Sequence, residues 1–277
     1  MQVVIAPTGA EVGRLAAAKV ASVVERRPDA VLGLATGSSP LAIYEDLAAR
    51  ARSGRLRVGA VRAFALDEYV GLPPEHPESY HSVIRRVATE PIGLDPALVH
   101  VPDGSAPDLD AAAADYERRI RAAGGIDLQI LGIGANGHIG FNEPTSSFAS
   151  RTRIKTLAPR TRRDNARFFD SAEDVPTHCL TQGLGTILEA RELVLVATGE
   201  AKAEAVAGMV EGPLSSFCPA SALQLHPAAT VIVDEAAASR LQLADYYRYT
   251  YENLPAWQRF DDGGRSGDGS TGAGTGA

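Results

Sequence analysis

The chain has 277 residues, 45% of them hydrophobic, and a formal net charge of -7 at pH 7. This length and apolar fraction allow one large α/β domain, and the acidic balance argues against a surface that binds nucleic acid. Glu11, Arg14 and Lys19 break up the apolar core that a signal peptide would need, so we expect no signal peptide. No apolar run is long enough to cross a bilayer. The two cysteines, Cys179 and Cys218, have neither metal-site spacing nor a disulfide framework. We therefore expect a cytoplasmic protein with reduced cysteines and no membrane or nucleic-acid partner.

Short apolar runs alternate with amphipathic stretches along the chain, an order typical of a parallel sheet covered by helices on both faces. We expect a single domain over residues 1–260 with the α/β fold, a three-layer α/β/α sandwich of Rossmann-like type with a mostly parallel sheet. Residues 261–277 have almost no bulky apolar side chains, which predicts a disordered tail. The predicted strands are Val3–Ile5, Ala30–Leu34, Val61–Leu66, Val99–Val101, Ile126–Ile130, Leu193–Ala197 and Thr230–Val233. The predicted helices are Glu11–Arg26, Leu41–Ala51, Leu109–Ala123 and Lys202–Val210.

A turn of small residues follows the second predicted strand. The helical pattern begins at Leu41, with Pro40 in its first turn. A hydroxyl-rich turn before a helix aims backbone N–H groups and hydroxyls at an anion. No G-x-G-x-x-G follows the first strands and no G-x-x-x-x-G-K-[ST] occurs in the chain, so we expect a sugar phosphate and not a nucleotide. The residues of this turn are Thr36, Gly37, Ser38 and Ser39.

Two adjacent carboxylates, Asp67 and Glu68, come directly after the third predicted strand. Carboxylates at the end of a strand are costly to leave unpaired, so they are solvated, cap a turn or helix, or have a function. On the residues alone, Asp67 could equally cap the turn before Gly71.

A histidine and a glutamate, His138 and Glu143, stand five residues apart in the glycine-rich segment LGIGANGHIGFNEP. The segment follows the predicted strand Ile126–Ile130, and strand-end loops of this kind are where α/β sheets bind ligands. Histidine suits proton transfer near neutral pH, and a glutamate can orient it. On these two residues alone, the pair could also be a surface histidine beside a carboxylate, with no catalytic role.

Five segments of the chain together resemble the glucosamine-6-phosphate deaminase family. They are ATGSSP, LDEYVGL, HPESY, GIGANGHIGFNEP and SRTRIKTL, in this order and at these separations. The likeness runs from about Val3 to about Leu254. It implies conversion of glucosamine 6-phosphate to fructose 6-phosphate and ammonia in amino-sugar catabolism, by an aldose–ketose isomerisation without cofactor or metal.

The resemblance also implies roles for individual residues. Asp67 would take the proton from C2 of the sugar, His138 would open the ring, and Glu143 would orient and tune the histidine. Asn136 stands where the family often has an aspartate, so GANGH departs from the GNDGH pattern of some members and matches the asparagine form of others. Asparagine cannot ionise near neutral pH, so His138 and Glu143 must carry the relay. The phosphate would be bound by Thr36, Gly37, Ser38, Ser39, Arg167 and Lys202.

A second group of matches concerns regulation. Some family members bind N-acetylglucosamine 6-phosphate between subunits and are hexamers, whereas others are monomers. The matching positions lead us to expect a homo-oligomer, a hexamer, that N-acetylglucosamine 6-phosphate activates. These positions are Ser146, Arg153, Lys155, Thr156 and Tyr249.

Several alternatives remain on the sequence alone. The nearest is a galactosamine-6-phosphate deaminase, because stereochemistry at one hydroxyl depends on side-chain placement. A lactone hydrolase or a pentose-phosphate isomerase of related fold is more remote. A different class is the sugar-phosphate-sensing module of transcription regulators, which should carry a helix-turn-helix segment and lose Asp67 or His138. Both residues are present, which favours an enzyme.

Overall fold

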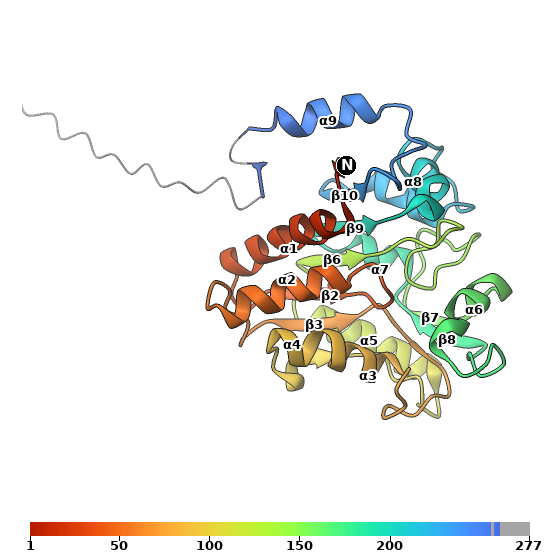
Figure 1. The fold of residues 1–277 in the computed structure, drawn as a ribbon. Helices are drawn as coiled ribbons and strands as arrows, with labels where there is room; N and C mark the ends of the chain where they lie inside the picture. The colour runs from red at the N-terminus through yellow and green to blue at the C-terminus, as the bar shows by residue number, and fades with distance from the viewer. Residues whose placement is uncertain (256–257, 261–277) are drawn as a thin grey trace, which may run out of the picture.

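Seven parallel strands form the central sheet (Figure 1). The structure is a computed structural model that describes residues 1–255 and 258–260. The strand order is β1-β10-β9-β6-β2-β3-β5, and each neighbouring pair is parallel. The seven predicted strands are confirmed with small shifts at their ends, the largest at β6, which begins at Leu128 and not at Ile126. The strands are β1 (Gln2–Ala6), β2 (Val31–Leu34), β3 (Arg62–Ala65), β5 (Val99–His100), β6 (Leu128–Leu131), β9 (Glu192–Ala197) and β10 (Ala229–Asp234).

Helices cover both faces of this sheet, which confirms the predicted three-layer sandwich. From β1 through β2 and β3 to β5, successive strands lie in one direction across the sheet. From β5 through β6 and β9 to β10, they lie in the opposite direction. Because crossovers between parallel strands are right-handed, the helices of the two halves lie on opposite faces. Helices α1, α2 and α4 accordingly pack together on one face (Figure 1). The helices are α1 (Gly9–Arg26), α2 (Leu41–Arg52), α3 (Tyr80–Ile84), α4 (Glu90–Ile92), α5 (Leu109–Ala122), α6 (Pro159–Asn165), α7 (Leu184–Leu188), α8 (Ala203–Val210) and α9 (Ala244–Glu252).

The direction of the chain reverses between β2 and β6, which are neighbours at the middle of the sheet. The chain after β2 leads to β3 on one side, and the chain after β6 leads to β9 on the other. Loops that diverge in this way leave a crevice outside the carboxyl ends of the strands, where open α/β sheets bind ligands. The hydroxyl-rich turn after β2 and the glycine-rich segment after β6 both begin at this crevice.

The sequence does not predict the second sheet, which has three antiparallel strands in the order β4-β8-β7. Asp67, expected in the loop after a strand, is instead the first residue of β4. Each of these strands has only three or four residues and several polar side chains, so none gives an apolar run. The strands are β4 (Asp67–Tyr69), β7 (Arg153–Thr156) and β8 (His178–Thr181). A small apolar cluster packs on this sheet and consists of Tyr69, Phe141, Leu157, Val175 and Cys179.

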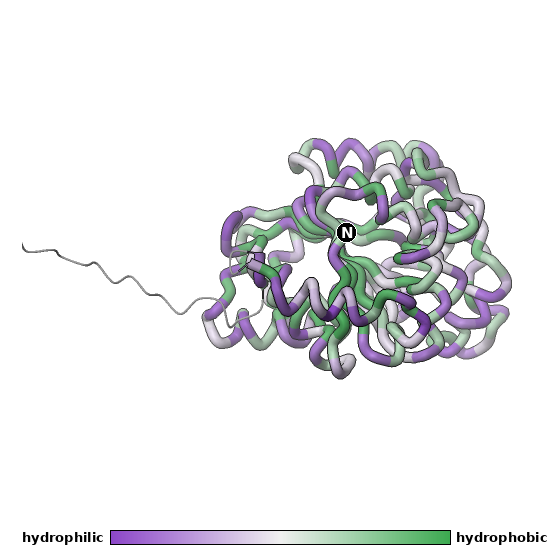
Figure 2. Tube along the Cα trace, turned by 90° about the horizontal axis from the view of Figure 1, so that it is seen from above, coloured by the Kyte–Doolittle hydropathy of each residue, from purple (hydrophilic) through white to green (hydrophobic). Residues whose placement is uncertain are grey.

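Apolar residues concentrate along the strands of the large sheet, as the green interior of Figure 2 shows. One apolar cluster joins this sheet to helices on both faces and runs from Val3 to Leu241 along the sequence. We propose on this basis that residues 1–260 form a single domain. The tail predicted for residues 261–277 lies outside the described residues. Both cysteines have free thiols, and Cys179 is buried, whereas Cys218 is only partly buried.

Candidate functional site

A cavity of about 410 Å³ opens at the crevice between β2 and β6. It contains most of the predicted catalytic and phosphate-binding residues, although these come from distant parts of the chain. A second hollow of about 430 Å³ lies at the start of α5 and contains none of them. The predicted residues that line the first cavity are Thr36, Gly37, Ser38, Ser39, Asp67, His138, Arg167 and Lys202.

The turn after β2 offers unpaired backbone donors to this cavity. Gly37 has φ +84°, a left-handed conformation that favours glycine. The N–H groups of Gly37, Ser38 and Ser39 have no hydrogen-bond partner among the described residues. Pro40 lies just before α2 and not within its first turn, a small correction to the expected position. Unpaired N–H groups and hydroxyls at a helix start can bind an anion, as the sequence predicts.

The two adjacent carboxylates have different surroundings. Asp67 and Glu68 are each only 4% exposed. Glu68 accepts hydrogen bonds from the backbone N–H groups of Tyr80 and His81 at 2.8 and 2.9 Å and thereby caps α3. Asp67 lines the cavity, and its carboxylate accepts no hydrogen bond from any residue that the structure describes. Burial, with a smaller contribution from Glu68, raises the pKa of Asp67 well above its usual range. A carboxyl group of this kind can exchange protons at moderate pH.

His138 and Glu143 lie together, as predicted. The Nδ1 atom of His138 is 3.6 Å from Oε2 of Glu143, and Asn136 donates a hydrogen bond of 2.8 Å to the same oxygen. The other carboxylate oxygen of Glu143 accepts a short hydrogen bond from Thr161. Burial favours the neutral form of Glu143, but its three polar neighbours outweigh burial and lower its pKa to about 2. Glu143 is therefore an anion at any working pH and places a negative charge beside the His138 ring.

Glycine at position 134 allows the histidine to reach the cavity. A Cβ atom on Gly134 would lie 2.2 Å from Cε1 of the His138 ring. The backbone of Gly134 also donates a hydrogen bond of 2.9 Å to the carbonyl of His138. The segment after β6 thus folds back on itself beneath the ring, and a larger residue at position 134 would displace the histidine.

Cationic side chains cluster at one side of the cavity. Lys202, in the turn before α8, donates a hydrogen bond of 2.7 Å from Nζ to the carbonyl oxygen of Ile133. Burial lowers the pKa of Lys202, Asp164 opposes this shift, and the nearby cations Arg167 and Arg160 add to it. Mutual repulsion of this kind is relieved when an anion binds among the cations. The sequence analysis missed Arg160, although the basic run from Arg160 to Arg163 after the SRTRIKTL segment is a signal for it.

An aromatic wall completes the cavity and was also missed. The ring of Tyr80 lines the cavity and packs on Phe141 with 5.9 Å between ring centroids. The hydroxyl of Tyr80 donates to that of Tyr69 at 3.4 Å, and Asn165 on α6 donates to Tyr69 at 2.9 Å. Tyr80 lies in a short helix and Tyr69 in a short strand, and elements of this length carry no periodic signal, so only the fold identifies this wall.

The residues predicted for regulation lie away from the cavity and are only partly brought together. Arg153 and Ser146 are within 3.4 Å of each other, and Lys155 and Thr156 follow Arg153 on β7. Tyr249 lies on α9, which packs near β1 at the far edge of the large sheet (Figure 1). Within one chain, these five residues do not form one site.

The described residues include no group of three or more His, Cys, Asp or Glu side chains that could hold a metal ion. None of the helices in the described part of the chain has the length and apolar character needed to span a membrane.

Comparisons with known proteins agree with this geometry. Residues 8–233 match the family model described as glucosamine-6-phosphate isomerases/6-phosphogluconolactonase. Glucosamine-6-phosphate deaminases of Pseudarthrobacter chlorophenolicus and Streptomyces coelicolor are each 61% identical to the chain, over 93% of it and 99% of their own length.

Solved structures give the same assignment. A monomeric glucosamine-6-phosphate deaminase superposes with a TM-score of 0.85 at 43% identity, covering 86% of this chain and 99% of its own. The 6-phosphogluconolactonase of Trypanosoma cruzi, with a TM-score of 0.69 and 20% identity over 87% of this chain and 97% of its own, shares the fold. The chain belongs to the glucosamine-6-phosphate isomerase/6-phosphogluconolactonase family and, within it, to the glucosamine-6-phosphate deaminases.

Proposed function

We infer that the protein converts glucosamine 6-phosphate and water to fructose 6-phosphate and ammonia. The observation that carries this inference is one cavity with a buried, unpaired carboxylate at Asp67 and cations and free N–H groups beside it. The relatives that are 61% identical to the chain are deaminases for this substrate. The reaction belongs to amino-sugar catabolism.

We propose that ring opening and the transfer of a proton from C2 to C1 use different side chains. His138, held against the Glu143 anion, opens the pyranose ring by moving a proton between the C1 hydroxyl and the ring oxygen. Asp67 then removes the proton from C2 and returns it to C1. Water replaces the nitrogen at C2, and ammonia leaves. The phosphate would be held by the turn after β2 together with Arg167 and Lys202.

An ammonia-release assay tests this function. We expect turnover with glucosamine 6-phosphate and much slower turnover with galactosamine 6-phosphate. Faster turnover of galactosamine 6-phosphate would show that this epimer, and not glucosamine 6-phosphate, is the substrate. Tight binding of either sugar phosphate without any ammonia would instead indicate a sensing module.

Changing Asn136 to Asp should shift the pH dependence of kcat. Asn136 donates to Glu143 at 2.8 Å, so a carboxylate there would face the Glu143 anion at hydrogen-bond distance. Two such carboxylates share a proton, which raises the apparent pKa of the pair above the value of about 2 that Glu143 has now. Because activity needs the Glu143 anion, the acidic limb of the kcat profile should move to higher pH. An unchanged profile would show that position 136 does not couple to the His138–Glu143 pair.

We propose that the protein assembles into a homo-oligomer, a hexamer, in which N-acetylglucosamine 6-phosphate raises the apparent affinity for substrate. The proximity of Arg153 and Ser146 supports an anion site there. Tyr249 lies on α9 beside β1, a different part of the fold, so a second chain would have to complete the site. The relative with 43% identity is monomeric, which makes this a demanding prediction. We expect sedimentation to show the assembly, and saturation curves with the ligand to show a lower substrate concentration at half-maximal rate. A monomer with ligand-independent kinetics would contradict it and leave the catalytic proposal intact.

We also propose a cytoplasmic location. The free thiols of Cys179 and Cys218 support it, since cytoplasmic proteins keep their cysteines reduced. Cell fractionation followed by the ammonia assay would test the location.

A further inference from the structure

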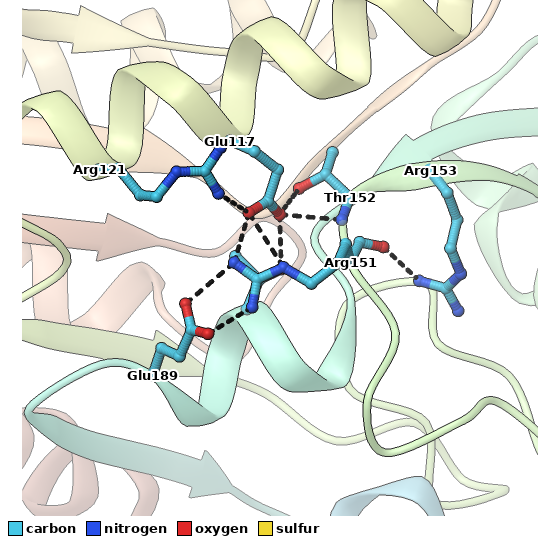
Figure 3. Close-up of polar contacts among 7 residues, drawn as sticks. Glu117, Arg121, Arg151, Thr152, Arg153 and Glu189 are labelled. Carbon is cyan, nitrogen blue, oxygen red and sulfur yellow. Dashed lines mark hydrogen bonds and ion pairs between the residues drawn. The ribbon is translucent and has the colours of Figure 1, made fainter.

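A buried carboxylate on α5 joins three separate parts of the fold (Figure 3). Glu117 is 5% exposed, and its Oε1 accepts hydrogen bonds from both the backbone N–H and the hydroxyl of Thr152, at 2.9 and 2.7 Å. The hydroxyl of Thr186 on α7 donates to the same oxygen at 2.6 Å. Arg151 donates to Oε2, and Arg121 lies 3.5 Å from it. Burial opposes the charge of Glu117, but these hydrogen bonds outweigh it and lower the pKa, so Glu117 is ionised at neutral pH.

The chain that Glu117 holds leads directly to Arg153, the first residue of β7. Arg153 is half-buried, and its Nη1 donates a hydrogen bond of 2.8 Å to the side-chain oxygen of Asn142. Since Thr152 is fixed at both its N–H and its hydroxyl, the backbone that carries Arg153 has little freedom. Glu117 therefore helps to fix the backbone from which the guanidinium of Arg153 reaches Asn142.

Asn142 in turn closes the short turn between the two members of the catalytic pair. Its side-chain amide donates to the carbonyl oxygen of Ile139 at 3.0 Å and to that of Gln182 at 2.8 Å, and the residue is fully buried. His138 comes just before Ile139, and Glu143 comes just after Asn142. Asn142 thus fixes the turn from which His138 and Glu143 approach each other to 3.6 Å.

We propose that Glu117 is a positioning residue for the deamination reaction, acting through Thr152, Arg153 and Asn142 on the His138–Glu143 pair. This inference rests on the proposed function. Glu117 does not line the cavity, so it acts on the geometry of the pair and not on substrate binding. Displacements well below 1 Å in such a pair are enough to slow proton transfer.

The test shortens the carboxylate while keeping its charge. Glu117→Asp withdraws the acceptor by one methylene, and we expect kcat to fall about 10-fold while KM changes less than about twofold. Glu189→Asp is the matched control, because Glu189 pairs with the same Arg151 but is largely exposed and does not contact Thr152. We expect wild-type kcat from this control. Arg153→Met breaks the same path without disturbing the buried charge of Glu117 and should give a similar loss.

The double variant Glu117→Asp/Arg153→Met distinguishes a shared path from two separate defects. A shared path predicts a loss of kcat no larger than that of the more damaging single change. Losses that multiply would overturn the proposal, and so would single variants that have lower melting temperatures but unchanged kcat. Absence of ammonia release by the wild-type protein would overturn the proposed function instead, so the two failures are distinguishable.

Discussion

Replacing Asp67 with asparagine should lower kcat by roughly 10²- to 10⁴-fold while changing KM little. Asp67 lines the cavity without a hydrogen bond from any described residue, and burial raises its pKa. The substitution removes a base but no phosphate contact, so the sugar phosphate should still bind. Steady-state kinetics on glucosamine 6-phosphate measure both constants. Wild-type kcat in this variant would exclude Asp67 as the base.

The same substitution should raise thermal stability at neutral pH. The folded-state pKa of Asp67 lies above its unfolded value, so its cost to the free energy of unfolding grows as the pH rises above the unfolded pKa and is complete once the pH reaches the folded-state pKa. This cost is absent below the unfolded pKa, near 3.9, so the gain in melting temperature should vanish in acid. Glu68→Gln is the matched comparison and should give a smaller gain, because burial also raises the pKa of Glu68 but the N–H groups at the start of α3 stabilise its anion.

Replacing Lys202 with alanine should raise KM for glucosamine 6-phosphate by roughly 10- to 100-fold with a smaller effect on kcat. The ammonium group of Lys202 lies at the cavity beside Arg167, where the phosphate is proposed to bind. Unphosphorylated glucosamine should be a very poor substrate of the wild-type enzyme, because it cannot use these cations. Comparable kcat/KM for the two sugars would contradict the proposed phosphate site.

A matched lysine is available as a control for this experiment. Lys19 pairs with Glu192 at 2.8 Å and is not among the residues that line the cavity. Lys19→Ala should therefore leave KM unchanged.

The pKa of Lys202 is lowered by burial and by neighbouring cations. Lys202 therefore loses its charge at a lower pH than an ordinary lysine does, and KM of the wild-type enzyme should begin to rise at that lower pH.

The large sheet and the turn after β2 could be predicted because their signals are local. An apolar run such as Val31–Leu34, followed by small hydroxyl residues and a helical pattern, identifies strand, turn and helix without knowledge of the rest of the chain. The order of strands and helices then gives the parallel sheet. The motif that contains His138 and Glu143 also lies within one short segment, so their proximity was predictable.

The remaining parts of the site depend on contacts between distant segments. Thr161 reaches Glu143 across 18 residues, and β4 is a strand only because it pairs with β8. Glu117 lies in a stretch of charged residues that resembles a solvated helix face, and its burial depends on Thr152 and on α7. No periodicity within one segment reports such contacts.

The most direct test of the account follows the hydrogen at C2. The wild-type enzyme is given glucosamine 6-phosphate that carries deuterium at C2, in ordinary water, and the fructose 6-phosphate is analysed by NMR. Asp67 is only 4% exposed, so a carboxyl that takes the deuterium from C2 is shielded from solvent before it delivers it. We expect fructose 6-phosphate with part of the deuterium at C1. Product formed with no deuterium at C1 would contradict the transfer by Asp67.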